Sequence, residues 1–326
     1  MHAFDKLIPF VSERLQKRGS AILIGSHERI PLKTESFQKI VPVVGPNMVF
    51  IDGGNGEIVK GPNVSVQFIR LYATWYEKNV RVSRELRELY VVVMAYQKSL
   101  DLGFEATIFD SNGKELHKFS FDAFDPALSF AGRRADPQAI ANHVRKLLEL
   151  RFADEICTKF SGILVRDGDL EARGEIMEDA LRQLKTTAQR KSVIVLGLSK
   201  TSTLCTDSGN SAIAVLHGIA PEGAWSYYAG GNVAFVKLHP GSEYVFRCDV
   251  FQHDREQLPK AWSALAAISA DPSFLGYPYG LIDADKFAQV TKEETEQLRA
   301  RFAVQSKELF RNIEAALDAH DLLNSF

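Results

Sequence analysis

The sequence predicts an α/β protein with a mixed sheet of three antiparallel and then two parallel strands, flanked by helices. Two observations lead to this class. About the first hundred residues hold apolar or alternating segments between turn residues, which is typical of an antiparallel meander. After Arg133-Arg134, helical periodicity alternates with short apolar segments. That alternation indicates parallel strands joined by right-handed crossovers, and we expect additional strands and helices after residue 200.

The N-terminal segment has the periodicity of an amphipathic helix. Over residues 3–18, apolar side chains recur at helical spacing, and Gly19 follows as a stop signal. Such a helix packs either on the core or on a partner, and the sequence leaves both open. Residues 20–46 contain three prolines and are expected to be irregular.

The stretch around Asp52 organises the chain. An apolar run, Met48 to Ile51, ends in Asp52, and three glycines follow within four positions. We expect a buried strand, then a turn into a second extended run. The glycines serve either a tight hairpin or the approach of backbone N–H groups to a phosphate. An aspartate that ends a buried strand needs a cation or a cluster of donors.

Further helices and strands are predicted from hydrophobic periodicity and from capping and turn residues. Asp136-Pro137 is an N-cap with proline at the first helical position, and Thr291 with Glu294 is a capping box. The last helix is expected to run close to Asp318. The predicted strands are 64–71, 88–96, 104–109, 162–166, 192–197, 232–238 and 244–250, the last two as a hairpin, and the other predicted helices are 137–159, 171–189 and 256–269.

This element order is the ribonuclease H-like arrangement, in which the first strand lies beside the fourth. Asp52 and Asp167 are therefore expected to end close together, and Glu149 lies at the margin of the apolar face of the first long helix. Converging carboxylates require cations, and Mg²⁺ or Mn²⁺ suit oxygen ligands. Two such ions about 3.5–4 Å apart are the usual apparatus for phosphodiester hydrolysis.

Each of these residues also has an ordinary structural explanation. Asp52 with its glycines, and Asp167-Gly-Asp169, are common turns, and a glutamate on a long helix is usually solvated. Lys200 follows an apolar strand and could approach a phosphate or lie on the surface. Arg133 and the aromatic and basic stretch 70–76 could contact DNA, or supply loop charge and core aromatics.

Composition narrows the function classes. The chain has 326 residues and a formal net charge of −2, so a global electrostatic attraction for nucleic acid is not indicated, while a local basic groove stays open. Its three cysteines are widely spaced, which argues against a disulfide framework and a zinc knuckle. We expect a cytoplasmic protein without signal peptide or membrane span. Zinc-peptidase, serine-hydrolase-elbow and Walker A motifs are absent from the sequence.

Several motifs together resemble the NurA family, prokaryotic nucleases that process DNA ends. The resemblance spans about residues 45–305, and the Gly-Tyr-Pro-Tyr segment with Asp285 is its most specific part. The motifs are Phe50-Ile-Asp52-Gly-Gly, Leu148-Glu149 with Ala153, Ile163-Leu-Val-Arg-Asp167-Gly-Asp-Leu170, Gly197-Leu-Ser-Lys200-Thr-Ser and Gly276-Tyr-Pro-Tyr-Gly-Leu-Ile-Asp-Ala-Asp285.

The resemblance implies a single domain over residues 1–326. Its parts would be an N-terminal helix (1–19), a ribonuclease H-like core (45–200) and an extension (201–326) that completes the site and the dimer. It implies a toroidal homodimer that docks on the hexameric HerA translocase. The implied activity is that of a single-strand endonuclease and 5′–3′ exonuclease with Mn²⁺ or Mg²⁺, two ions per site, in DNA end resection, repair or defence.

The resemblance also assigns residues. The metal ligands fall on Asp52, Glu149, Asp167 and Asp285, while Lys200 would contact the transition state and the DNA. Arg133 and Tyr277 are further predicted DNA contacts. In much of the family a histidine occupies the position of Asp285, so an imidazole acid would be absent here.

Two other functions remain open from the sequence. An actin-like ATPase shares the strand order, and Asp52 with its glycines could form its first phosphate hairpin; no clear second hairpin is present. A non-catalytic adaptor of a DNA translocase is the other. The presence of all three primary acids argues against an inactive nuclease.

Overall fold

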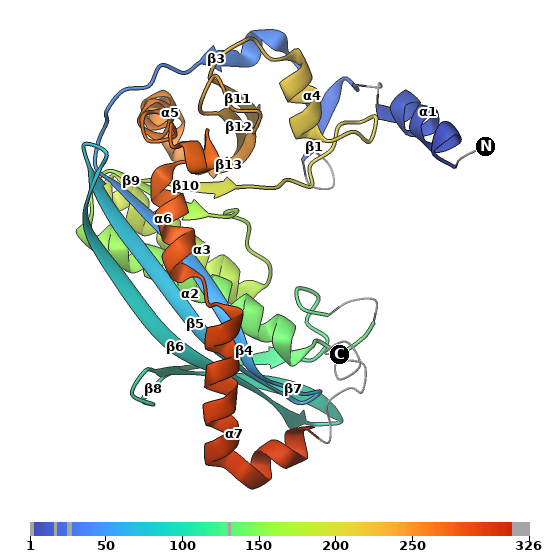
Figure 1. The fold of residues 1–326 in the computed structure, drawn as a ribbon, viewed down its shortest axis with the longest axis vertical. Coiled ribbons are helices and arrows are strands. Elements are labelled where there is room, and N and C mark those ends of the chain that lie inside the picture. The colour runs from blue at the N-terminus through green and yellow to red at the C-terminus, as the bar shows by residue number, and fades with distance from the viewer. Residues whose placement is uncertain (1–2, 16–17, 25–27, 130–131, 315–326) are drawn as a thin grey trace.

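The structure is a computed structural model that describes residues 3–15, 18–24, 28–129 and 132–314 (Figure 1). Seven α-helices lie in the described residues: α1 (Phe4–Leu15), α2 (Pro137–Lys159), α3 (Glu175–Lys191), α4 (Ala212–Ile219), α5 (Leu258–Ala267), α6 (Tyr279–Ala288) and α7 (Lys292–Glu314). Short 3₁₀ helices cover Thr34–Ser36, Gln252–Gln257 and Pro272–Phe274. None of the helices in these ranges has the length and hydropathy needed to cross a membrane.

The strands form one large mixed sheet and a small hairpin. They are β1 (Ala21–Ile24), β2 (Glu28–Pro31), β3 (Phe37–Lys39), β4 (Met48–Lys60), β5 (Val64–Glu77), β6 (Val80–Lys98), β7 (Asp101–Asp110), β8 (Glu115–Asp122), β9 (Ile163–Asp167), β10 (Ile194–Ser199), β11 (Trp225–Gly230), β12 (Val233–Lys237) and β13 (Phe246–Val250). In the described residues the large sheet has 11 strands in the order β3-β11-β12-β13-β10-β9-β4-β5-β6-β7-β8, and β1 and β2 form a separate two-stranded sheet.

The predicted fold class is confirmed. Strands β4 to β8 form an antiparallel meander, and β9 pairs in parallel with both β4 and β10. The first strand of the core therefore lies beside the fourth, with Met48 opposite Ile163 and Ile51 opposite Arg166. The predicted hairpin of β12 and β13 is also present.

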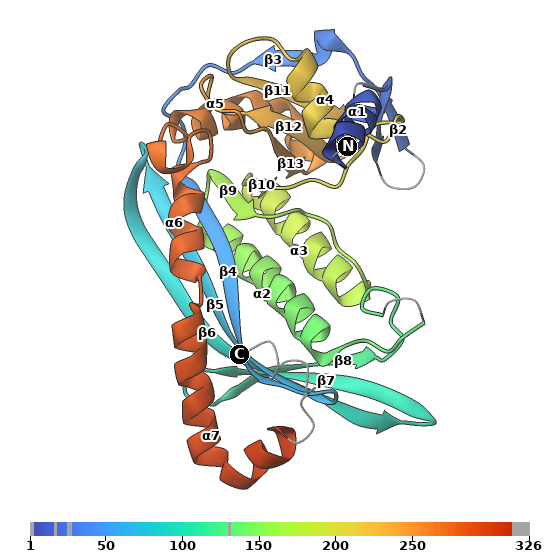
Figure 2. The ribbon, with the colours of Figure 1, turned by 45° about the vertical axis from the view of Figure 1, so that its right-hand side comes forward.

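Two layers of helices cover the centre of the sheet (Figure 2). Side chains alternate along a strand, so Val49 and Ile51 of β4 pack in the core beneath α2 and α3, and Met48 and Phe50 pack in the core beneath α5 and α6. Helix α7 continues from α6 along the far part of β4. The predicted helix 137–159 is confirmed, and Asp136 caps it by accepting a hydrogen bond from Gln138 N.

The glycine stretch after Asp52 does not turn, which corrects the prediction. β4 runs straight through it, with Gly53 opposite Leu71 and Gly56 opposite Phe68 on β5. A methyl group on Gly53 would lie 2.5 Å from Oε1 of Glu149, and one on Gly54 would lie 2.1 Å from the carbonyl oxygen of Ala288. The glycines therefore permit close packing on both faces of the strand, and the phosphate hairpin of the ATPase interpretation is not formed here.

Other predictions need correction. Residues 20–46 are not irregular throughout, because they contain β1, β2, β3 and a 3₁₀ turn; β8 and β11 were not predicted either. Strands β2, β3 and β8 are mostly exposed, so they lack the apolar alternation that reveals a strand. Helix α3 begins at Glu175 rather than at 171. The predicted end of the last helix lies outside the described residues.

Helix α1 is confirmed over Phe4–Leu15 and stands apart from the large sheet (Figure 1). It contains no buried residue. Its large apolar side chains are all exposed, namely Phe4, Leu7, Ile8, Phe10, Val11 and Leu15.

Candidate metal centre

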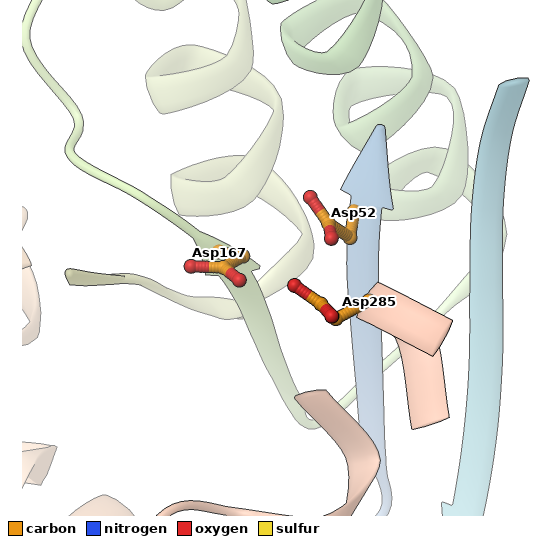
Figure 3. A group of neighbouring side chains, drawn as sticks. All are labelled: Asp52, Asp167 and Asp285. Atoms are coloured by element: carbon orange, nitrogen blue, oxygen red, sulfur yellow. The ribbon is translucent and has the colours of Figure 1, made fainter. Parts of the chain in front are cut away.

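Three aspartates converge at the end of β9 (Figure 3). Asp52 follows Ile51 on β4, and Asp167 follows Arg166 on the parallel neighbour β9, so the pairing register brings the two carboxylates to one level. Asp285 approaches them from α6. Carboxylate oxygens of the three residues all lie within 4.8 Å of one another. The structure thus brings together three of the four acids that the resemblance assigns to metal.

Helix α6 is held in place by a buried acid. Asp283 accepts hydrogen bonds from Thr74 Oγ1 at 3.1 Å and Tyr76 OH at 3.2 Å, and it pairs with Arg81 at 3.0 Å. A methyl group on Gly280 would lie 2.0 Å from the ring of Phe50, so this glycine lets α6 lie directly on β4. These contacts fix the position from which Asp285 reaches the group.

The loop after Asp167 is anchored by a second buried acid. Asp249 on β13 accepts a hydrogen bond from Leu170 N at 3.0 Å and pairs with Arg247 at 2.7 Å. Arg247 also contacts Glu171 at 2.6 Å. Neither Asp283 nor the Arg247–Asp249 pair was predicted to support the site. The sequence did contain one indication of the second pair, because Arg247 and Asp249 are two charged residues inside an otherwise apolar strand.

Lys200 and Tyr277 complete the surroundings of the acids. The ammonium nitrogen of Lys200 lies 2.8 Å from Asp167 Oδ2 and 2.7 Å from Asp285 Oδ1, and 5.3 Å from the centre of the Tyr277 ring. Tyr277 is 1% exposed. Burial and the nearby charge of Asp167 raise the pKa of Tyr277 far above its ordinary value. The phenol therefore stays neutral beside the carboxylate.

The acids carry more negative charge than their surroundings neutralise. Burial, followed by the charges of Asp167 and Glu149, raises the pKa of Asp52 to about 8. Burial also raises the pKa of Asp167, although Lys200 opposes this shift. Burial lowers the pKa of Lys200, but its contacts with Asp167 and Asp285 outweigh burial and leave that pKa above its ordinary value. Such a set of oxygens favours a hard divalent cation.

Glu149 lies apart from the three aspartates. It is 1% exposed and packs against Gly53, on the face of β4 opposite to the side chain of Asp52. Its Oε2 is 2.7 Å from Nη2 of Arg166, and its Oε1 contacts Arg145. Two arginines therefore neutralise Glu149 in this structure, and its assignment as a metal ligand stays a prediction.

The remaining predicted residues occupy different surroundings. Arg133 is exposed in the loop before α2, and in the described part of the chain no contact joins it to the acids. Asp169 accepts a hydrogen bond from Glu171 N, as a turn residue does. Because Tyr277 is buried beneath Lys200, it supports Asp167 and offers no open surface to DNA.

No protein-family model matches the sequence, and no curated protein matches it. The structure is similar to the crystal structure of the NurA nuclease from Sulfolobus solfataricus, with a TM-score of 0.50 and 16% identity over 96% of each chain. The chain has the NurA fold. Weaker likenesses are to the catalytic domain of human endonuclease V (TM-score 0.34, 11% identity, 92% of this chain and 98% of that one) and to endonuclease V from Bacillus subtilis (0.35, 10%, 93% and 97%).

The three aspartates, with carboxylate oxygens within 4.8 Å of one another, are the feature of this structure suited to metal chemistry.

Proposed function

We propose that this protein is a metal-dependent DNA nuclease that hydrolyses phosphodiester bonds. The observation that carries the proposal is the convergence of Asp52, Asp167 and Asp285. The NurA fold supports it, because a nuclease is built on the same architecture. The enzyme would act as a single-strand endonuclease and a 5′–3′ exonuclease.

The residues present fit a divalent ion. All three side chains offer carboxylate oxygens, the donor that Mg²⁺ and Mn²⁺ prefer. The raised pKa of Asp52 means that its charge lacks sufficient compensation without a further cation. The ammonium group of Lys200 lies between Asp167 and Asp285 and takes the place of such an ion as their positive partner.

Each side chain has a defined task in this proposal. Asp52, Asp167 and Asp285 would hold the ion, which when bound supplies Lewis acidity to activate water and to stabilise the leaving oxygen. Lys200 would turn from the carboxylates toward the phosphate and offset its negative charge. Tyr277 keeps water away from one side of Asp167. The family resemblance implies two ions and makes Glu149 a further ligand, whereas in this structure Glu149 pairs with Arg166 and Arg145.

The biological setting is also part of the proposal. The enzyme would act as a cytoplasmic homodimer with a HerA-type hexameric ATPase, in DNA end resection, repair or defence. The exposed apolar residues of α1 support a partner interaction, since they cover no part of the core. The assignment to a HerA-type partner rests on the family resemblance.

Cleavage of end-labelled linear DNA tests the activity. Single- and double-stranded substrates are incubated with Mn²⁺, Mg²⁺ or EDTA, using the wild type, Asp52→Asn and a surface control, Asp179→Asn. We expect degradation that needs the metal, persists in the control and disappears in Asp52→Asn. A folded wild type that cuts no DNA, even with its translocase, would favour the adaptor function instead.

A further inference from the structure

A groove of about 460 Å³ lies beside α6, next to the candidate metal centre. In the sheet order β9-β4-β5-β6, the aspartates lie over β9 and β4, while the groove lies over β5 and β6. Helix α6 contributes to both, with Asp285 on one side and Lys286 and Phe287 on the other. The groove is lined by Arg70, Tyr72, Arg84, Leu86, Lys286, Phe287 and Gln289.

The groove presents an aromatic face. The ring of Phe287 stacks on the ring of Tyr72, with centroids 5.2 Å apart and an interplanar angle of 22°. Tyr72 is 2% exposed and serves as a rigid base for Phe287, which is 36% exposed. The guanidinium of Arg84 lies 5.8 Å from the Phe287 centroid. Aromatic rings backed in this way, with a neighbouring arginine, are typical surfaces for stacking nucleic acid bases.

The groove also offers positive charge that no carboxylate of the described residues neutralises by an ion pair. Arg84 and Lys286 are exposed, and neither forms an ion pair with a carboxylate in the described part of the chain. Arg70 differs, because Glu88 at 2.9 Å and Glu294 take up its charge. Two cations in the lining of the groove are thus available to phosphate oxygens.

We propose that this groove binds one nucleotide of a single DNA strand, with its base on Phe287 and the flanking phosphates at Arg84 and Lys286. This inference rests on the proposed nuclease function. The groove would bind a nucleotide of the substrate strand that lies beyond the bond to be cut. It requires a single strand, because the face of a paired and stacked base is not free to lie on Phe287. The strand would cross α6 between the metal centre and the groove.

Binding in EDTA tests the groove without cleavage. The fluorescence anisotropy of a labelled oligothymidylate is titrated with the wild type, Phe287→Leu and Arg84→Glu. Arg182→Glu on α3, which makes the same charge change at an exposed site, is the control. We expect about tenfold weaker binding for the two groove variants, the loss of one stacked base or phosphate contact. The control should bind like the wild type.

Phe287→Trp adds a direct reading of stacking. A base on this ring should quench the new tryptophan emission as the oligonucleotide saturates the protein, while affinity is retained. Unchanged emission at saturation would overturn the proposal, as would wild-type affinity of Phe287→Leu, or equal losses for single-stranded and blunt duplex DNA. Binding in EDTA is independent of cleavage. A wild type that binds the oligonucleotide in EDTA but cuts no DNA with Mn²⁺ or Mg²⁺ would refute the nuclease function and still support the groove as a binding site.

Discussion

The ammonium nitrogen of Lys200 lies 2.8 Å from a carboxylate oxygen of Asp167, in the middle of the acids that would bind metal. A lysine in this position has two consequences. It stabilises the acids in the absence of an ion, and it competes with any ion that enters. Lys200 also contacts Asp285, so an incoming cation has to displace it from at least one of two aspartates.

Replacing Lys200 with methionine should therefore separate metal binding from catalysis. We expect Lys200→Met to bind Mn²⁺ about tenfold more tightly, because no ammonium group competes for the carboxylates, and to cleave DNA much more slowly. Isothermal titration calorimetry measures the first effect and a cleavage assay the second. Lys185→Met on α3 is the matched control. Equal or weaker Mn²⁺ binding by Lys200→Met would contradict this competition.

The raised pKa of Asp52 predicts how the metal-free protein responds to pH. Its folded pKa of about 8 lies above the ordinary value of 3.8. Asp52 therefore contributes stability that is complete below its unfolded pKa and is lost as pH rises through about 8. We expect the free energy of unfolding to fall between about pH 5 and pH 8, by up to roughly 1.4 kcal/mol per unit.

Denaturant titrations in EDTA across this pH range measure the effect. Asp52→Asn should remove this contribution to the slope, since its amide does not titrate, and should be folded at every pH. Adding Mn²⁺ should reverse the trend in the wild type, because a metal binds the ionised carboxylate. A wild-type slope unaffected by Asp52→Asn would show that Asp52 does not titrate in this way.

The pairing of Glu149 with Arg166 predicts a strong energetic coupling. Both side chains are buried, so Arg166→Met leaves a buried carboxylate short of a partner and should cost about 3–5 kcal/mol of stability. The double variant Glu149→Gln with Arg166→Met should recover a large part of this loss. Urea unfolding of the two single variants and the double variant measures the coupling. Simple additivity would mean that the two residues do not stabilise each other.

Helix α1 predicts a change in association without a change in stability. Leu7 and Val11 are exposed, so glutamate at both positions should leave the thermal midpoint unaltered. If the helix binds a partner, the same variant should form fewer homodimers or complexes with a HerA-type ATPase. Light scattering after gel filtration measures both, with Glu13→Gln as control. Unchanged assembly would assign the apolar face of α1 no role in these contacts.

Local pattern was sufficient for the centre of the fold. Apolar runs and turn residues gave the strand order, and that order brought Asp52 and Asp167 together, because parallel neighbours end at one edge of the sheet. The place of Asp285 needed the family resemblance, since no periodicity relates α6 to β4. The supporting acids escaped prediction for a similar reason. Asp283 can be buried because Thr74, Tyr76 and Arg81 donate hydrogen bonds to it, and these residues lie about two hundred positions earlier in the chain.

The glycines after Asp52 show a different limit of sequence reasoning. Glycine is usually read as a signal for a turn, but here the reason for Gly53 is the side chain of Glu149, and the reason for Gly54 is the backbone of Ala288. Both neighbours come from helices far along the chain. A pattern within ten residues of Asp52 contains no information about them, so the strand was expected to end too early.

The close approach at Gly54 sets the width of the acidic group. Asp52 lies two residues before Gly54 on β4, and Asp285 lies three residues before Ala288 on α6. A single methyl group at position 54 would act as a wedge 2.1 Å from the Ala288 carbonyl oxygen and would force the strand and the helix apart. Asp52 on the strand and Asp285 on the helix would then move apart as well. The spacing between the carboxylates thus depends on the absence of a Cβ atom at position 54.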